Sequence, residues 1–536
     1  MKKNITIMLA VMLVFTLMLS GCSSNISQSK ENSLKTSGTQ KSKELVIGYG
    51  IDVEGVNPKD CFETKYYMLS IVYDTLVKYD NGEIKPNLAE SWEVNEDKTE
   101  YTFKLKEGIT FSDGTPFNSE AVKKNLMAIK NVSRYWWLPI TKDLKSIDII
   151  DDYQFKLTMT KPSSAVLSNL LQYCPLGMVA PSTIKDLDPV TIEGSIGTGP
   201  YKLSDYEANK YYTFVQNEHY WGEKQNWDKV TLKIIPDSDA RMLALSSGEI
   251  DVIAGSFFLP FDTIKSVSDN DKFTSKTSDT LVDTRNIKIN TKSNILKNAN
   301  VRKAIAHALN KKEIVNSIFS GYEEVYDSWL IKDLPYCDVS LKPYLYDIEK
   351  AKKLLDEAGW VQVDGSKYRQ KDGKELKVEF GWISDFQTDK DLAFAIKGYL
   401  ENIGIHVNAQ SADLATWSNN FCEGKYDIVI DDMTPIPYQP YISINTLGME
   451  KADGQFISGL PMKEELNKNI KIIGSSGNDE EIASAFEYIL TTVHDEAVII
   501  PIASKKEVIL YNNNKIKDVK FANLPQMIVP DNIKSK

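Results

Sequence analysis

The chain is poor in histidine and cysteine, the two residue types that bind transition metals most readily. Its 536 residues include four histidines and five cysteines. No histidine lies within four residues of another histidine or of a cysteine, and no CxxC motif occurs. Direct binding of nickel or zinc requires imidazole or thiolate donors gathered about 2 Å from the ion. We therefore expect no directly bound metal unless His406 and His494 converge in space, and any metal carried should arrive inside a chelator.

The cysteines also lack the spacing of a disulfide framework. Cys61, Cys174, Cys337 and Cys422 are scattered along the chain. We expect mostly free thiols, and a single bridge among these four stays open.

Short motifs typical of enzymes are missing as well. The sequence contains no GxSxG elbow, no GxxxxGK[ST] loop, no HExxH and no dinucleotide-binding fingerprint. Asp431 and Asp432 are adjacent carboxylates after the strand-like run 426–430. Neighbouring strand residues point to opposite faces, so the two make a poor acid–base pair. We expect no enzymatic activity and no cofactor.

Positive charge is in deficit. The chain has 63 Lys and Arg against 74 Asp and Glu, a formal net charge of −11. An acidic chain without basic clusters is a poor partner for nucleic acid.

The N-terminus carries the most specific local signal. Lys2 and Lys3 precede an apolar run at 5–19, and the letters LSGC follow at 19–22. This run is shorter than the roughly 20 residues that span a membrane, so residues 1–21 are predicted to be a secretory signal. The site resembles a bacterial lipobox, which predicts lipidation of Cys22 and anchoring at the outer face of the cytoplasmic membrane. The alternative is an ordinary signal peptide with a chance cysteine. Residues 22–43 are polar and aperiodic, which predicts a flexible tether.

The rest of the chain mixes strand and helix patterns. About 500 residues exceed one usual hydrophobic core, so two or more lobes are expected. Alternating apolar residues predict strands at 44–49, 101–105 and 153–159. Helical spacing is found at 119–129, 302–309, 347–358 and 392–403. The fold class is therefore α/β.

Nine short motifs occur in an order and spacing that identify a family. They are YDTLV (73–77), PNLAESW (86–92), YTFKL (101–105), FSDGTPF (111–117), GTGPY (197–201), NEHYW (217–221), GEID (248–251), VRKA (301–304) and AGW (358–360). The chain resembles the extracytoplasmic solute-binding proteins of peptide and nickel ABC importers (family 5), from residue 44 to about residue 528. Most of these motifs are expected to be structural, with Trp92, Phe103 and Phe111 packing in cores.

The resemblance implies a two-lobed, periplasmic-binding-protein-like clamp of type II, of the large class with an extra subdomain in the first lobe. The first lobe would comprise residues 44–282, the second 283–496, and residues 497–536 would return to the first. The crossing strands would lie near 285–290 and 498–502. Such a clamp closes on its ligand, and the permease subunits of the importer recognise the closed form. We expect a monomer.

Two segments are candidates for ligand contact. Residues 133–138 read SRYWWL, and three large rings in a row cannot all face one core. Arg134 offers a planar fork for carboxylates, and Trp136 and Trp137 offer apolar walls. Nickel-importer relatives carry an arginine at the position of Arg134, although a surface turn with buried aromatics is the alternative.

The second segment, MTPIPYQPY at 433–441, favours the nickel branch. Peptide-binding relatives have an aspartate before the tyrosine that matches Tyr438, whereas this chain has Pro437, as the nickel and metallophore branch does. Thr434 departs from that branch, which often has tryptophan there. Four further residues are expected to line the ligand site, namely Phe62, Tyr66, Tyr67 and Tyr101. Arg285 is either a second cation facing the ligand or an exposed strand residue.

The leading hypothesis is a binding protein for nickel or cobalt in a small carboxylate-bearing chelator. The alternative is a di- or oligopeptide binder that anchors the peptide amine on another carboxylate, Asp385 or Asp431. A third class, a surface protein without a transport role, stays open.

Overall fold

The computed structural model describes residues 42–536, apart from a few short gaps. The gaps are residues 54, 60–65, 81, 136–137, 188–189, 193, 256–258, 269, 385, 432–439 and 450–452. The chain divides into two units, Met1–Lys41 and Ser42–Lys536, and the second unit is described here. Several predicted residues lie outside the described ones, namely Cys22, Phe62, Trp136, Trp137, Asp385, Thr434 and Tyr438. In the described part, no helix combines the length and apolar character that a membrane crossing needs.

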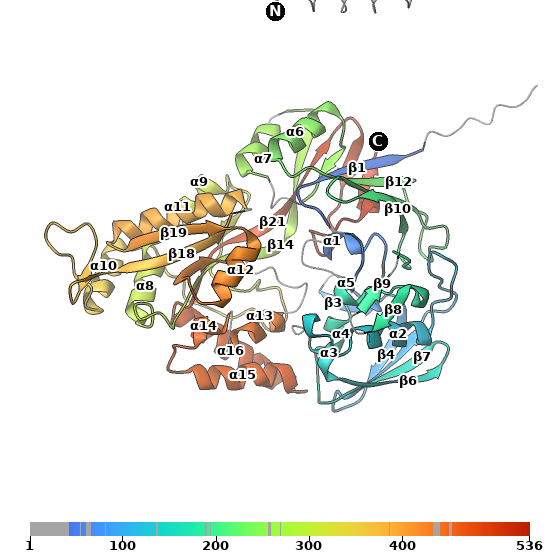
Figure 1. The fold of residues 1–536 in the computed structure, drawn as a ribbon, viewed down its shortest axis with the longest axis horizontal. Coiled ribbons are helices and arrows are strands. Elements are labelled where there is room, and N and C mark those ends of the chain that lie inside the picture. The colour runs from blue at the N-terminus through green and yellow to red at the C-terminus, as the bar shows by residue number, and fades with distance from the viewer. Residues whose placement is uncertain are drawn as a thin grey trace, which may run out of the picture. The chain divides into compact units, whose positions relative to one another are not determined.

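One mixed sheet of eleven strands forms the framework (Figure 1). Its order is β10-β11-β12-β1-β13-β21-β14-β20-β18-β19, with β15 paired to β21. The strands are β1 (Glu44–Tyr49), β10 (Tyr201–Glu207), β11 (Tyr211–Gln216), β12 (Lys229–Ile234), β13 (Val252–Ile253), β14 (Phe273–Ile289), β15 (Glu324–Val325), β18 (Lys377–Ile383), β19 (His406–Ala412), β20 (Ile428–Ile430) and β21 (Ile499–Asn512). The predicted α/β class is confirmed.

The longest strands, β14 and β21, join the two lobes of the fold (Figure 1). They pair antiparallel from Phe273 opposite Asn512 to Lys288 opposite Ile499. The predicted crossing segments, 285–290 and 498–502, lie at one end of this pair. We call the elements before β14, together with the chain after β21, the first lobe, and the elements between β14 and β21 the second lobe.

The first lobe contains a separate antiparallel sheet in the order β4-β5-β7-β6. Its strands are β4 (Ala89–Val94), β5 (Glu100–Leu105), β7 (Gln154–Met159) and β6 (Leu144–Asp151). Helix α2 (Ser119–Ile129) begins where the Asn118 side chain accepts a hydrogen bond from the Ala121 amide, as a good N-cap does. Phe103 and Phe155 stack at 5.2 Å in the core of this subdomain. The core also contains Phe111, with Trp92 packed against it, so the predicted structural role of these aromatics is confirmed.

Two of the family motifs meet at a tight joint in the first lobe. A side chain on Gly197 or Gly199 would approach the backbone of Val72 to 2.1 or 2.5 Å, so only glycine fits at either position. Beside this joint, buried Asp74 accepts hydrogen bonds from Thr198 Oγ1 and Trp221 Nε1, both at 3.0 Å. The motifs around 73–77 and 197–201 therefore have a structural role, which is to pack these two segments together.

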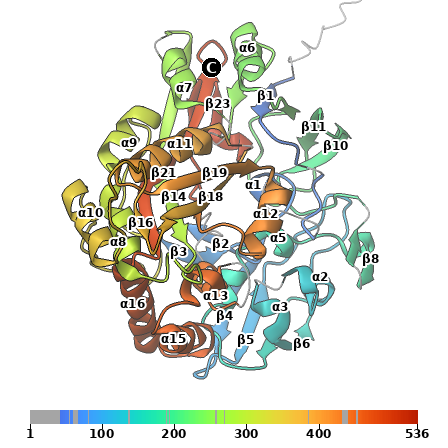
Figure 2. The same cartoon turned by 60° about the vertical axis from the view of Figure 1, so that its left-hand side comes forward.

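The second lobe places helices on both sides of strands β18, β19 and β20. Helices α11 (Gln387–Asn402) and α12 (Leu414–Cys422) pack on the strands, as Figure 2 shows. Helices α8 (Ala299–Ala308) and α10 (Ile348–Glu357) pack together, and all three helices predicted in this part of the chain are present. A further layer contains α13 (Pro440–Leu447), α15 (Lys463–Ser475) and α16 (Asp479–Asp495).

The C-terminal segment returns to the first lobe. Strands β22 (Ile516–Val519) and β23 (Ile533–Ser535) form a small hairpin sheet. The indole Nε1 of Trp227 donates to the carbonyls of Pro530 and Ile533 at 3.1 and 2.8 Å. These bonds hold the C-terminus against the first-lobe core.

Candidate ligand-binding site

The topology points the carboxyl ends of the parallel strands in the two lobes toward each other. Strands β13 and β14 both pair antiparallel with β21, so β13 runs parallel to β14. The part of β21 that pairs with β13 also pairs with residues 274 and 275 of β14. Strand β20 runs antiparallel to β14, with Ile430 opposite Ile287. Strand β1 is parallel to β13, and strand β18 is parallel to β20. The carboxyl ends of both sets of strands therefore face the stretch of β14 between residues 275 and 287. Small-molecule sites in α/β folds form outside such strand ends.

The predicted ligand segments follow these strand ends in the chain. The segment with Phe62, Tyr66 and Tyr67 comes after β1, and the segment with Thr434 and Tyr438 comes after β20. Tyr66 opens the short helix α1 (Tyr66–Leu69).

Asp431, the first residue after β20, belongs to a compact charge cluster. Lys288 Nζ forms ion pairs with Asp431 Oδ2 and, at 3.3 Å, with Asp453 Oδ1. Asp453 also accepts a hydrogen bond from Thr446 Oγ1. Burial by itself would lower the pKa of Lys288, but the two carboxylates outweigh it and the pKa is raised. Asp431, one of the two proposed anchors for a peptide amine, is thus already paired with a lysine.

Arg285 is placed differently from both expectations. It is buried in β14, and its Nε donates to Glu323 Oε1 and Oε2 at 2.9 and 2.8 Å. Its Nη1 donates to Asp389 Oδ1 at 3.0 Å. Its guanidinium carbon also lies 4.9 Å from the centre of the Phe319 ring. Two carboxylates thus pair with this guanidinium inside the second lobe. The bond to Asp389 connects the start of α11 to β14.

Arg134 is exposed on a short turn that is anchored by the neighbouring residue, Tyr135. The turn is a 3-10 helix, η2 (Ser133–Tyr135), in which Tyr135 is buried and Arg134 is exposed. The Tyr135 hydroxyl donates to the backbone carbonyl of Lys59, in the segment that follows β1. The turn that carries Arg134 is therefore tied to Lys59.

Lys59 is a structural residue that sequence reasoning missed. It is 1% exposed, and its Nζ donates to the carbonyls of Pro175 and Gly177 at 2.6 and 3.0 Å. Burial lowers the pKa of Lys59 to about 7. A neutral amine has two N–H donors, which matches the two carbonyl acceptors. No local pattern in the sequence marks this lysine as buried.

Tyr101 packs in the core of the first-lobe subdomain. It is buried in β5, and its hydroxyl donates to the carbonyl of Ser163. Burial raises the pKa of Tyr101 to about 12. The alternation of β5 turns this side chain inward, and a ligand contact at Tyr101 stays a prediction.

The two histidines considered for metal binding have separate partners. His406 Nδ1 lies 3.1 Å from Glu375 Oε2, and its ring stacks on Tyr368 at 4.4 Å. His494 Nε2 forms a hydrogen bond with the Lys342 carbonyl at 2.8 Å. Within the described residues, no group of three or more His, Cys, Asp or Glu is placed to hold a metal ion.

The open question about a disulfide is answered for one cysteine. Cys174 is disulfide-bonded, whereas Cys337 is a buried free thiol and Cys422 an exposed one.

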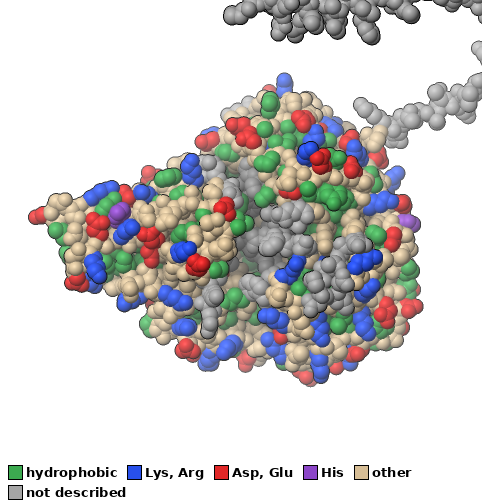
Figure 3. Space-filling view, in the orientation of Figure 1, with side chains coloured by type: hydrophobic (Ala, Val, Ile, Leu, Met, Phe, Trp, Pro, Cys, Tyr) green, Lys and Arg blue, Asp and Glu red, His purple; other side chains and the backbone are tan. Residues whose placement is uncertain are grey.

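Charges of both signs are interspersed over the described residues on the face in Figure 3. Long-range attraction of a charged polymer requires a patch of one sign. This face therefore offers local rather than long-range electrostatic contacts.

Comparison with known proteins places this geometry among extracytoplasmic binding proteins. The family of bacterial extracellular solute-binding proteins, family 5 (Middle), matches residues 83–455. The nickel-binding periplasmic protein of Escherichia coli (strain K12) is 30% identical over 86% of this chain and 88% of its own length. A probable D,D-dipeptide-binding periplasmic protein, DdpA, of the same organism is 28% identical over 75% of this chain and 76% of its own length. The crystal structure of NikA from Brucella suis in complex with Fe(III)-EDTA has a TM-score of 0.87 and 29% identity, and covers 92% of this chain and 100% of that one.

Proposed function

Since the chain belongs to the bacterial extracellular solute-binding proteins of family 5, on the nickel-binding branch, we propose that it captures a chelated transition metal outside the cell and delivers it to the permease of an ABC importer. The cargo in this proposal is nickel or cobalt in a small chelator that bears carboxylates. The protein acts as a carrier and not as an enzyme.

Arg134 is the observation that carries the proposal. It is exposed on a turn held by the bond from Tyr135 to Lys59, which fixes its backbone. A guanidinium fork matches the two oxygens of a carboxylate. A structural relative was solved with Fe(III)-EDTA, a metal inside a polycarboxylate chelator. Trp136, Trp137 and Tyr438 would wall the complex.

The rest of the proposal concerns delivery. The lobes, proposed as residues 44–282 with 497–536 and residues 283–496, close on the ligand, and the importer recognises the closed form. Lipidation at Cys22 holds the monomer at the outer face of the cytoplasmic membrane, and residues 22–43 form a flexible tether between the anchor and the folded part.

Peptide binding is the second candidate. A dipeptide-binding relative and the position of Asp431 at the end of β20 favour it. A peptide amine there would have to share Asp431 with Lys288, which makes this anchor weaker than an unpaired carboxylate.

Native mass spectrometry of the protein purified from its own host, coupled to elemental analysis, tests both candidates. A metal and a small organic molecule that leave together support the chelate proposal. A peptide without metal supports the alternative, and a bare metal ion that withstands washing with EDTA contradicts both.

A further inference from the structure

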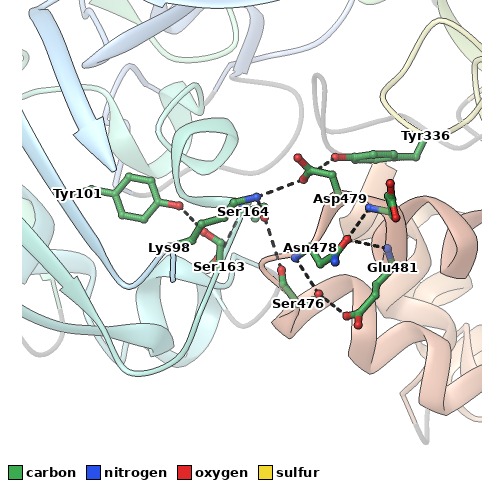
Figure 4. A network of polar contacts seen from close by, with 11 residues as sticks. Lys98, Tyr101, Ser163, Ser164, Tyr336, Ser476, Asn478, Asp479 and Glu481 are labelled. Atoms are coloured by element: carbon green, nitrogen blue, oxygen red, sulfur yellow. Dashed lines mark hydrogen bonds and ion pairs between the residues drawn. The ribbon is translucent and has the colours of Figure 1, made fainter. Parts of the chain in front are cut away.

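The two lobes touch through a polar contact whose residues are separate from the predicted ligand contacts. Lys98 lies in the turn between β4 and β5 of the first lobe, and Asp479 is the first residue of α16 in the second lobe. Lys98 Nζ lies 3.2 Å from Asp479 Oδ1 and also donates to Ser164 Oγ at 3.1 Å (Figure 4). A second, longer bond at 3.5 Å runs from Ser164 Oγ to the Ser476 carbonyl.

The second lobe holds Asp479 ready for this contact. The Tyr336 hydroxyl donates to the same Oδ1 at 3.2 Å (Figure 4). The Tyr336 ring stacks on Phe486 of α16 at 5.4 Å. Asn478 caps α16 by accepting from the amides of Glu480 and Glu481. Because Asn478 caps the helix, the Asp479 carboxylate is available for contacts beyond its own lobe.

The first lobe holds Lys98 equally firmly. Lys98 has a φ of 52°, in the left-handed region, and its amide donates to the Asn95 carbonyl at 3.0 Å. The Asn95 side chain accepts from the amides of Thr99 and Glu100 at 2.9 and 2.8 Å. The Lys98 carbonyl accepts from the Ser163 amide at 3.1 Å, and the Tyr101 hydroxyl donates to the Ser163 carbonyl. Tyr101 thus supports the segment that presents Ser164.

A second pair of residues interacts electrostatically between the lobes. Tyr441 lies on α13 of the second lobe, and Asp143 ends helix α3 (Ile140–Asp143) of the first lobe. Burial and then the charge of Asp143 raise the pKa of Tyr441 to about 12.

We propose that Lys98 and Asp479 form a closing latch, made in the closed clamp and broken in the open one. Apparent affinity for a ligand that binds the closed form scales with the closed fraction of the free protein. A contact made only in the closed form therefore strengthens binding of every ligand by the same factor, without touching it. Lys98 and Asp479 side chains are 24% and 66% exposed, so the pair is worth roughly 0.2–1 kcal/mol, or about 1.4- to 5-fold in affinity.

The test uses three single variants and one double variant of the full chain. Lys98→Met and Asp479→Asn each remove one charge while keeping side-chain size, and the double variant removes both. Lys202→Met is the control, because the Lys202–Glu218 pair (2.6 Å; side chains 33% and 60% exposed) has similar exposure but lies within the first lobe. Calorimetry with nickel(II)–L-histidine and with Fe(III)-EDTA measures affinity, and small-angle X-ray scattering of the ligand-free protein measures opening.

We expect each latch variant to bind about 1.4- to 5-fold more weakly, with a larger radius of gyration in the ligand-free state. The double variant should be no weaker than either single variant, and Lys202→Met should match the parent protein. In about 1 M salt, where the Debye length falls to about 3 Å, the parent should approach the latch variants. Additive losses of affinity in the double variant would overturn the latch. The latch would also be overturned if scattering is unchanged in all variants and binding of both probes is unchanged or undetectable. Altered scattering without binding of either probe would support the latch while contradicting the chelate proposal.

Discussion

The buried Lys59 predicts an unusual dependence of stability on pH. Its pKa is about 7 in the folded protein against 10.5 as the reference value, because burial disfavours the charged ammonium. Between these two values the unfolded chain binds more protons than the folded protein. The free energy of unfolding therefore rises with pH through this window, by up to about 1.4 kcal/mol per pH unit.

The magnitude follows from the two pKa values. Between about pH 7 and about pH 9, the folded lysine releases its proton while the unfolded lysine keeps it, and the linkage integral amounts to about 2 kcal/mol. Lys59→Met removes this contribution. The variant also leaves the carbonyls of Pro175 and Gly177 without their donor, which costs about 1–3 kcal/mol for each buried group at every pH. The two effects differ in pH dependence and can be separated.

Urea unfolding across that pH range, followed by tryptophan fluorescence, measures the difference between the parent protein and the variant. We expect the gap between the two proteins to widen by about 2 kcal/mol toward pH 9. Lys202→Met, which alters a lysine whose side chain is 33% exposed, should keep the parent slope. Parallel stability profiles for the parent and Lys59→Met would refute the reasoning, because they would show that Lys59 titrates alike in the folded and unfolded states.

The remaining predictions concern the proposed site and its anchoring. Arg134→Ala should weaken binding of the metal chelate by about 2–5 kcal/mol, or about thirty- to several-thousand-fold, with little recovery in Arg134→Lys, as measured by calorimetry. Thermal melts of the ligand-free protein should stay within about 1 kcal/mol, because Arg134 is exposed, and unchanged affinity would contradict the site. Replacing His406 and His494 together should leave chelate binding unchanged in a folded protein, whereas a tenfold loss, about 1.4 kcal/mol, would indicate direct ligation. Cys22→Ala should release the protein into the medium or leave a precursor, and normal processing with retention at the membrane in a cell-fractionation assay would contradict lipidation.

Local sequence patterns predicted many of the secondary-structure elements. Alternation and helical spacing predicted β1, α2 and α10, because these periods depend on which face of an element is apolar. The motifs around residues 73–77 and 197–201 helped to identify the family, and the structure shows that they meet at a tight joint. Gly197 and Gly199 lie so close to Val72 that no other residue fits.

The partners of charged side chains were decided only by the tertiary structure. Arg285 reads as a strand arginine in the sequence, yet one of its partners, Asp389, lies 104 positions further along the chain. Lys59 is separated by 116 positions from Pro175, and Lys98 by 381 from Asp479. A charged residue has the same local pattern whether it faces water, a ligand or a buried carboxylate. Its role depends on which distant backbone or side chain meets it after the lobes pack, and that packing is a property of the whole chain.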